Sequence, residues 1–248
     1  MRNVAPYASL VRRSRQFLLV AFVVAAAGVF FAIVGLGLFV IPFAVPGNQG
    51  FELYHVVRTA MFLGGGALGL FGVLLAVRAI TWKTDNDLAQ ITAAYLSEYF
   101  DERFTLIRNV SRIGLGYIDA VLVGPPGVLV FRLVDKHGSF LNDRGKWLKL
   151  NKRNQWVPMR FNPTKDTADD VRNLRKYLAS KDIQDIPVYG VVVFIPDEQH
   201  AHIQAEAPVV PVANLPHLYD ALLDNYLAKP ERITSDQISS VVNLLYRE

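Results

Sequence analysis

Two long apolar runs near the N-terminus most constrain how this chain can fold. Phe17–Val45 is a run of 29 residues without a charge, and Thr59–Val77 is a run of 19 more. A helix needs about 20 apolar residues to cross the hydrocarbon core of a bilayer. Two buried helices of a soluble core are a poor alternative, because neither run has a polar face. The sequence therefore predicts a transmembrane hairpin with helices at about 17–45 and 59–80.

The first run could also be a cleaved signal peptide, but its length argues against this. It exceeds the ~7–15-residue apolar segment of such peptides, and a second apolar run follows soon after. Neither run contains an ionisable residue of the kind that transport pathways usually keep, so the hairpin is most simply an anchor. We assign residues 1–83 to this membrane anchor, whose direct partner is the lipid bilayer.

Basic residues lie mainly outside the hairpin loop. The loop between the runs carries only Arg58, whereas the flanking segments contain Arg2, Arg12, Arg13, Arg15, Arg78 and Lys83. Positive charge is enriched on the cytoplasmic side of membrane proteins. We therefore expect a two-span membrane protein with both termini and the following domain in the cytoplasm.

Glycines in the second run predict close helix packing. Gly65 and Gly69 form a small-xxx-small pair, and Gly28 and Ala32 have the same spacing in the first run. Such pairs allow helix backbones to approach closely. The partner of Gly65 and Gly69 is either the first run of the same chain or a second copy, which would make a homodimer.

Residues 84–248 form the second predicted domain, and their charge is nearly balanced. Residues 85–248 carry 19 Lys/Arg and 21 Asp/Glu, so the high pI belongs largely to the anchor. The net charge alone is therefore no argument for nucleic-acid binding. The chain has no cysteine, which excludes disulfides and Cys-based zinc sites or nucleophiles.

Hydrophobic periodicity predicts helices and strands in this domain. The expected elements are a helix over Thr84–Phe100, strands at Phe104–Ser111, Tyr117–Val123 and Val128–Val134, a polar hairpin over Ser139–Met159, a helix from Asn162-Pro163 to Ser180, strands at Ile186–Ile195 and Val209–Val212, and helices at Leu215–Leu227 and Ser235–Tyr246. This order predicts an α/β sandwich with a central mixed β-sheet.

Asp119 and Arg132 are isolated charges within apolar strands, which are costly to bury unless paired. The stretch around them resembles the nuclease-related domain (NERD) family over about Asp85–Ile195. The resemblance rests on the leading helix and on Arg108-Asn-Val110, Gly116-Tyr-Ile-Asp119-Ala-Val-Leu-Val123, Pro126-Gly127-Val-Leu-Val-Phe131, Gly138, Trp147 and Asn162-Pro163. It implies a fold similar to the restriction-endonuclease core.

The resemblance implies an active site with an acid on the leading helix, an Asp on the second strand, an acid-x-Lys motif on the third, and a Gln inside the Asn-Pro helix. Carboxylates would hold Mg²⁺ and the Lys would position water against a phosphodiester. The matching positions here are Asp119, Arg132, Val134 and Asp166, with Asp87 or Glu98 as the first acid. No Asp or Glu in the chain is followed two residues later by Lys.

This departure from the family pattern favours a pseudo-nuclease without a metal site or cofactor. An arginine at a ligand position places a cation where Mg²⁺ should bind, and Arg132 could instead pair directly with Asp119. The alternative is a divergent metal-dependent nuclease or other nucleic-acid-processing enzyme, with relocated ligands and Mg²⁺ as its cofactor.

A basic segment at residues 144–160 is the remaining candidate site. It has no acidic residue and contains Arg144, Lys146, Trp147, Lys149, Lys152, Arg153, Trp156 and Arg160. Its functional interpretations are contact with nucleic-acid phosphates or with anionic lipid headgroups; the alternative is a solvated hairpin whose tryptophans pack on the sheet. We therefore expect a membrane-anchored NERD-like protein that is catalytically inactive and binds a nucleic acid, a partner or an anionic headgroup at the cytoplasmic membrane face.

Overall fold

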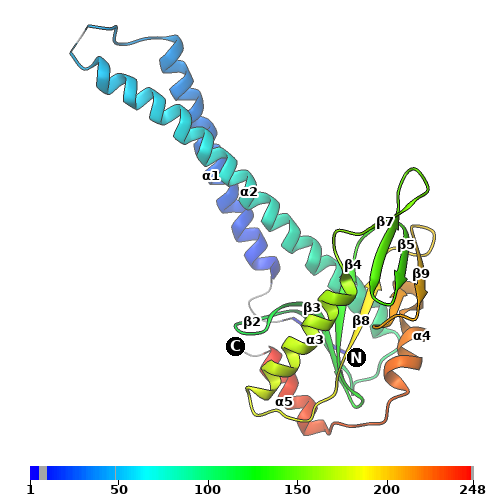
Figure 1. Ribbon diagram of the computed structural model, residues 1–248. Helices are drawn as coiled ribbons and strands as arrows, with labels where there is room; N and C mark the ends of the chain where they lie inside the picture. The colour runs from blue at the N-terminus through cyan, green and yellow to red at the C-terminus, as the bar shows by residue number, and fades with distance from the viewer. Residues whose placement is uncertain (6–9, 48, 247–248) are drawn as a thin grey trace. The chain divides into compact units, whose positions relative to one another are not determined.

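The computed structural model describes residues 1–5, 10–47 and 49–246, without the side chains of residues 10–15 and 81–86. The chain forms two compact units (Figure 1). One comprises Leu10–Thr84, and the other comprises Met1–Ser9 together with Asp85–Glu248.

The first unit is a hairpin of two apolar helices. Helix α1 spans Leu10–Val40 and helix α2 spans Phe51–Ser97. The segments Gln16–Val40 and Phe51–Ile80 are each long and apolar enough to cross a membrane, and 11% of the most apolar window in each is buried. Large apolar side chains such as Phe22, Val40 and Leu70 are about 70% exposed.

Small residues let the two helices of the hairpin approach closely. A Cβ built at Gly28 would lie 2.2 Å from the backbone nitrogen of Gly69, and one built at Gly65 would lie 2.4 Å from that of Ala32. The small-residue pairs thus face each other within one chain. The sequence left two partners open for Gly65 and Gly69, and the structure has the one within the same chain. A homodimer through Gly65 and Gly69 stays a prediction, and it would have to displace α1.

The helix boundaries differ from three expectations. The first helix ends at Val40 and not near residue 45, and the second begins at Phe51 and not near residue 59. The helix expected to begin at Thr84 is instead the last part of α2, which continues without a break to Ser97. Thr84 and Asp85 are therefore not a helix start, because the backbone before them is already helical.

A six-stranded mixed sheet forms the centre of the second unit, in the order β1-β2-β3-β4-β8-β10 (Figure 1). Its strands are β1 Arg2–Val4, β2 Thr105–Arg112, β3 Gly116–Gly124, β4 Gly127–Val134, β8 Val188–Phe194 and β10 Val212–Asn214. The three central strands β2, β3 and β4 are antiparallel, and β8 adds to β4 in parallel. The expected mixed sheet is confirmed. Strand β1, which pairs in parallel with β2, lies within residues 1–83, which we assigned from the sequence to the membrane anchor.

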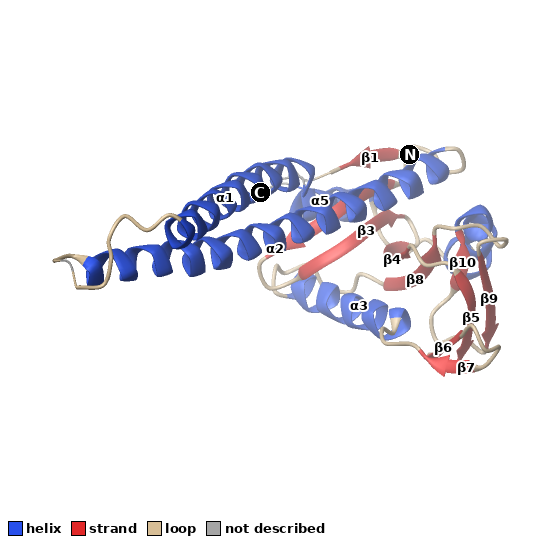
Figure 2. Ribbon diagram, turned by 90° about the horizontal axis from the view of Figure 1, so that it is seen from above, coloured by secondary structure: helices blue, strands red, loops and turns tan. Residues whose placement is uncertain are grey.

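A second, smaller sheet has the order β7-β6-β5-β9 (Figure 2). Strands β5 Gly138–Asp143, β6 Lys146–Leu150 and β7 Trp156–Pro158 form the polar hairpin expected from the sequence. Strand β9, Ala201–Glu206, was not expected, and it pairs in parallel with β5.

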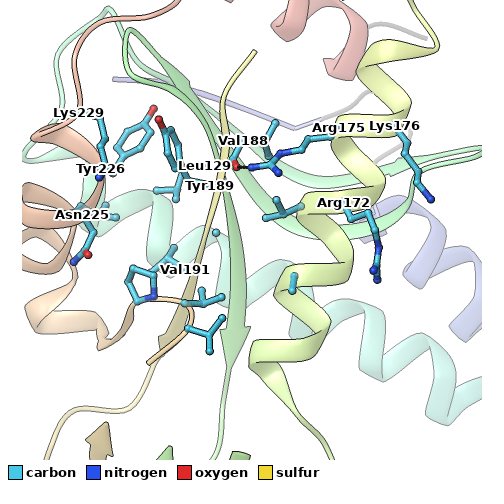
Figure 3. Close-up of a pocket in the computed structure, with 17 residues that line it drawn as sticks. Leu129, Arg172, Arg175, Lys176, Val188, Tyr189, Val191, Asn225, Tyr226 and Lys229 are labelled. Atoms are coloured by element: carbon cyan, nitrogen blue, oxygen red, sulfur yellow. Dashed lines mark hydrogen bonds between the residues drawn. The ribbon is translucent and has the colours of Figure 1, made fainter. Parts of the chain in front are cut away.

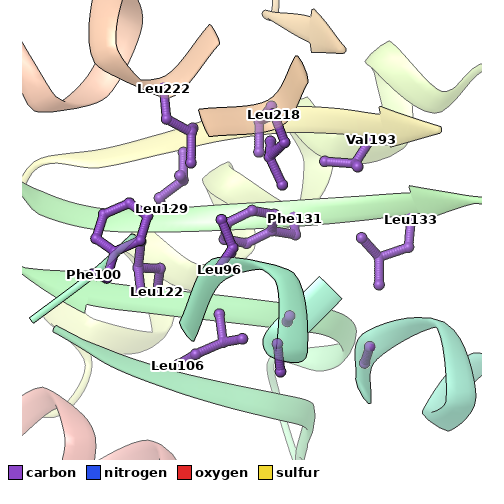
Figure 4. Close-up of a cluster of buried hydrophobic side chains, with 14 of the residues drawn as sticks. Leu96, Phe100, Leu106, Leu122, Leu129, Phe131, Leu133, Val193, Leu218 and Leu222 are labelled. Carbon is purple, nitrogen blue, oxygen red and sulfur yellow. The ribbon is translucent and has the colours of Figure 1, made fainter. Parts of the chain in front are cut away.

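Helices cover both faces of the main sheet. On one face, α3 (Pro163–Ala179) and α5 (Ser235–Tyr246) pack against a core that includes Val128 and Val130. On the other face, the end of α2 and the helical segment Leu215–Leu227 (η1, α4 and η2) cover Leu129, Phe131 and Leu133 (Figure 4). Alternate residues of β4 therefore enter different cores, because successive side chains of a strand point to opposite faces.

Candidate functional site: a buried carboxylate–guanidinium cluster

Asp119 lies on β3 at the point where pairing with β4 ends. The last paired residues before it are Ala120 and Phe131. The Asp119 side chain is almost fully buried, and its Oδ2 atom accepts a hydrogen bond from the backbone N–H of Leu133 at 2.8 Å. The carboxylate thus continues the hydrogen bonding to β4 beyond the paired residues.

Arg132 on β4 lies between two carboxylates. Its Nη1 atom is 3.6 Å from Oδ2 of Asp119, and its Nη2 atom is 2.5 Å from Oδ2 of Asp170 on α3. The direct pairing of Arg132 with Asp119 expected from the sequence is present. Asp170, which lies in the helix expected from Asn162-Pro163 to Ser180, is the closer partner.

Two residues of the sequence signature surround Asp119. Tyr117 donates a hydrogen bond from its hydroxyl group to Oδ1 of Asn109 at 3.1 Å. Asn109 is buried and has a φ of 55°, a left-handed conformation that is uncommon for a residue other than glycine. It interrupts the ladder between the pairs Arg108–Ala120 and Val110–Ile118. Conformations of this kind occur preferentially at functional sites.

Burial controls the acid–base properties of the cluster. It raises the pKa of Asp119, although the charge of Arg132 and the N–H of Leu133 act in the opposite direction. It also raises the pKa of Asp170 to about 6 against the attraction of Arg132. Burial lowers the pKa of Arg132, but the charges of Asp119 and Asp170 outweigh this effect and raise it overall. One guanidinium therefore does not compensate fully for two buried carboxylates.

The other positions of the family pattern lie outside this set of contacts. Val134 is 5% exposed and packs in an apolar cluster with Phe194 and Trp147. Asp166 lies one helical turn before Asp170 and acts on Asp119 and Arg132 only through its charge. Asp87 is an exposed residue of α2, and the exposed Glu98 directly follows the last residue of that helix, Ser97.

The residues at this position do not fit a magnesium ion. Mg²⁺ requires oxygen ligands at near-octahedral positions, whereas the Oδ2 atoms of Asp119 and Asp170 both face the guanidinium of Arg132. Among the residues that the structure describes, no group of three or more Asp, Glu or His side chains could hold a metal ion. A cation supplied by the protein already lies between the two carboxylates.

The basic segment 144–160 separates into exposed cations and one buried tryptophan. All six of its Lys and Arg residues are exposed. Trp147 is 4% exposed and donates from Nε1 to Oγ1 of Thr164 at 2.9 Å, which ties the smaller sheet to α3. Trp156 is 38% exposed. Only Trp156 is therefore available to stack on a ligand.

The structure thus defines a chain with an apolar helical hairpin and an α/β domain that contains a buried carboxylate–guanidinium cluster. Residues 85–195 match the family model described as NERD, the nuclease-related domain. This confirms the resemblance expected from the sequence, over the same part of the chain. A search of curated proteins and a search of solved structures each gave no significant match.

Asp170 is the main residue of the cluster that sequence reasoning missed. The available signal was its spacing from Asp166, because residues i and i+4 lie on one face of a helix. Asp166 occupies a position of the family pattern, so this helix face was already expected to point to the site.

Proposed function

We propose that this chain is a membrane-anchored member of the nuclease-related domain proteins whose domain binds a ligand at the cytoplasmic membrane face without cleaving it. The proposal includes a restriction-endonuclease-like core for residues 84–248. The match of residues 85–195 to the family supports this. The exposed apolar side chains of α1 and α2 support insertion into a bilayer, where such surface is favourable.

The observation that carries the proposal is the position of Arg132. Its guanidinium occupies the space between Asp119 and Asp170, the carboxylates nearest to where the family pattern places a metal. Removing the arginine from this space would leave two carboxylates together without a cation. The buried, apolar Val134 cannot position water as the lysine of the family pattern would. The domain therefore keeps the fold of its relatives while its catalytic position is filled by an ion pair.

The proposed ligand contact is the exposed basic segment 144–160. Its six cations could neutralise phosphates, and nucleic acid is the ligand that the family relationship favours. Anionic headgroups of the bilayer are the other ligand of matching charge. Both would bind more weakly as the salt concentration rises, because their attraction to exposed charges is screened.

The alternative proposal is a divergent metal-dependent nuclease. It is favoured by the two acids of α3, Asp166 and Asp170, which lie near Asp119 and could represent relocated ligands. In this alternative, Arg132 would leave its present position and Mg²⁺ would be recruited from solution.

Nuclease assays on the full chain in nanodiscs distinguish the two proposals. The protein is incubated with single- and double-stranded DNA and RNA in the presence of Mg²⁺ or Mn²⁺, and Asp119→Ala is the control for contaminating activity. We expect no cleavage above that of the Asp119→Ala variant. Metal-dependent cleavage that the variant loses would establish the nuclease.

Binding to nucleic acid is measured in parallel at two salt concentrations, with vesicles of phosphatidylserine as the second ligand. The variant Lys152→Gln/Arg153→Gln tests the basic segment, and we expect it to weaken salt-sensitive binding. Binding to neither ligand would contradict a role for residues 144–160.

A further inference from the structure

A large cavity lies beside β8, away from the contacts of Arg132. It has a volume of about 700 Å³ and is bounded by α3, β8, the segment Val209–Pro211 and η2 (Leu223–Leu227) with its flanking residues (Figure 3). Ligand sites in proteins usually have volumes of about 300–1,000 Å³. All of its 17 lining residues belong to one unit of the chain.

The cavity follows from an unpaired stretch of sheet edge. Strand β8 pairs with β4 along its whole length, but β10 pairs with it only at Val192–Phe194. The first half of β8, Val188–Val191, therefore has a strand on one side and the cavity on the other. A Cβ at Gly190 would lie 2.5 Å from Cγ2 of Thr167, so this glycine lets α3 pack closely beside the opening.

Much of the cavity lining is aliphatic, and two of its polar side chains are bonded within the protein. Leu129, Val188, Val191 and Leu222 are among its buried lining residues. Tyr226 donates from its hydroxyl group to the carbonyl of Gly127 at 2.8 Å, and Nη2 of Arg175 donates to the carbonyl of Val188 at 2.6 Å (Figure 3). A nucleobase placed among these aliphatic side chains would lose hydrogen bonds to water, which is unfavourable unless they are replaced.

The charged residues of the cavity have one sign. Arg172, Arg175 and Lys176 on α3 and Lys229 after η2 line it, and none of the 17 lining residues is acidic. All four cations are exposed, and among the described residues neither Lys176 nor Lys229 forms an ion pair. The cavity thus combines an apolar interior with positive charge on residues that reach solvent.

We propose that this cavity binds a monoacyl lipid anion, with the acyl chain in the aliphatic interior and the carboxylate or phosphate at the exposed cations. Each methylene group removed from water would favour binding, and the headgroup would keep contact with solvent. The inference goes beyond the proposed function, because none of its residues belongs to the Arg132 cluster or to the basic segment.

Photolabelling of the full chain in phosphatidylcholine nanodiscs tests this proposal. The probe is palmitate with a diazirine group on its chain, and labelled peptides are mapped by mass spectrometry. We expect the probe to label peptides within Val171–Lys176 or Val188–Val191. The amount of label is divided by that on the apolar segment Phe51–Ile80, which serves as the internal reference. Unlabelled palmitate and lysophosphatidate should compete, whereas AMP and neutral monopalmitoylglycerol should compete at least tenfold less well.

Two variants locate the site. Ala168→Trp places a large ring in the cavity from an exposed position and should abolish this labelling. Lys176→Gln/Lys229→Gln should weaken palmitate binding about 25-fold, since each exposed basic residue strengthens binding of an anionic group about fivefold. The matched control is Lys136→Gln/Lys165→Gln, which removes two exposed charges outside the cavity.

The proposal is overturned by absence of labelling in the two cavity segments, by labelling that survives Ala168→Trp, or by an equal loss in the control variant. Competition by AMP as strong as that by palmitate would also overturn it and would indicate a nucleotide site. Folding of each variant is checked by the resistance of its α/β domain to limited proteolysis.

Discussion

At the scale of single residues, the main feature of the α/β domain is that the guanidinium of Arg132 contacts two carboxylates. The guanidinium is 3.6 Å from Asp119 and 2.5 Å from Asp170, and all three side chains are largely removed from solvent. Buried ion pairs of this kind contribute little net stability compared with apolar packing, but removing one member is costly because the remaining charges stay buried. The cluster therefore specifies one arrangement of β3, β4 and α3.

We predict that Arg132→Leu destabilises the domain by about 3–5 kcal/mol, because Asp119 and Asp170 would then lie buried without a cation. Chemical unfolding followed by tryptophan fluorescence measures this, with Trp82 and Trp156 replaced by Phe so that only Trp147 reports. Arg103→Leu is the control, since Arg103 pairs with Asp101 and Glu231 at the exposed surface. An equal loss of stability in the two variants would show that the buried cluster contributes no more to the free energy of unfolding than an exposed ion pair.

The pKa of Asp170 predicts a dependence of stability on pH. Its value in the folded domain is about 6, above the ordinary value of 3.8. Between these two values the folded state binds more protons than the unfolded state, so the free energy of unfolding falls as the pH rises. The slope for one such group is at most about 1.4 kcal/mol per pH unit.

We expect Asp170→Asn to remove this contribution. The difference in stability between the original chain and the variant should therefore shift in favour of the variant as the pH rises from 4 to 6. Thermal unfolding of both proteins at several pH values measures the difference. A constant difference over this range would mean that Asp170 does not titrate there.

At the scale of elements, α3 connects the parts of the second unit. The side chain of Asn162 accepts a hydrogen bond from the N–H of Lys165 at 3.0 Å and caps the helix, and Thr164 in its first turn accepts the indole N–H of Trp147. Asp170 then reaches Arg132 on β4, and Arg175 reaches the carbonyl of Val188 on β8. One helix thus contacts the smaller sheet, the carboxylate–guanidinium cluster and the cavity.

The hairpin helices are held together by backbone contact at small residues. We predict that Gly65→Leu separates α1 from α2, because its side chain would meet the backbone of Ala32. Overpacking of this kind costs about 1–3 kcal/mol. Gly64→Leu is the matched control, since a Cβ at Gly64 has no atom within 4 Å.

Pulsed electron resonance between spin labels measures the helix separation. The chain has no native cysteine, so the labels attach only at Ile33→Cys on α1 and Leu63→Cys on α2, both exposed positions. The distance should increase in Gly65→Leu and stay unchanged in Gly64→Leu. An unchanged distance in both would indicate that the close backbone contact is not what joins the helices.

At the scale of the whole molecule, the proposed function requires a particular membrane topology. We predict that the loop between α1 and α2 faces the outside of the cell and that the α/β domain faces the cytoplasm, because the basic residues flank the hairpin at its open ends. An impermeant thiol reagent should label Gln49→Cys on intact cells, and should label Ser239→Cys only after permeabilisation. The opposite pattern would place the domain outside.

Much of the architecture could be predicted because its signals are local. Uncharged length identifies the apolar helices, and runs of β-branched residues such as Val128–Val134 identify the strands of the main sheet. The three-residue β1 and the largely exposed β9 have no such pattern. Their strand conformation depends on pairing with β2 and β5, which are far away in the sequence.

The same distinction applies to the candidate site. The amino-acid sequence is enough to predict that Asp119 and Arg132 lie on neighbouring strands and to show that the acid-x-Lys motif is absent. The pairing of Arg132 with Asp170, the burial of Trp147 and the cavity beside β8 are seen only in the folded domain. The physical reason is that periodicity reports the environment along one element, whereas shared charges and cavities arise where elements distant in sequence pack together.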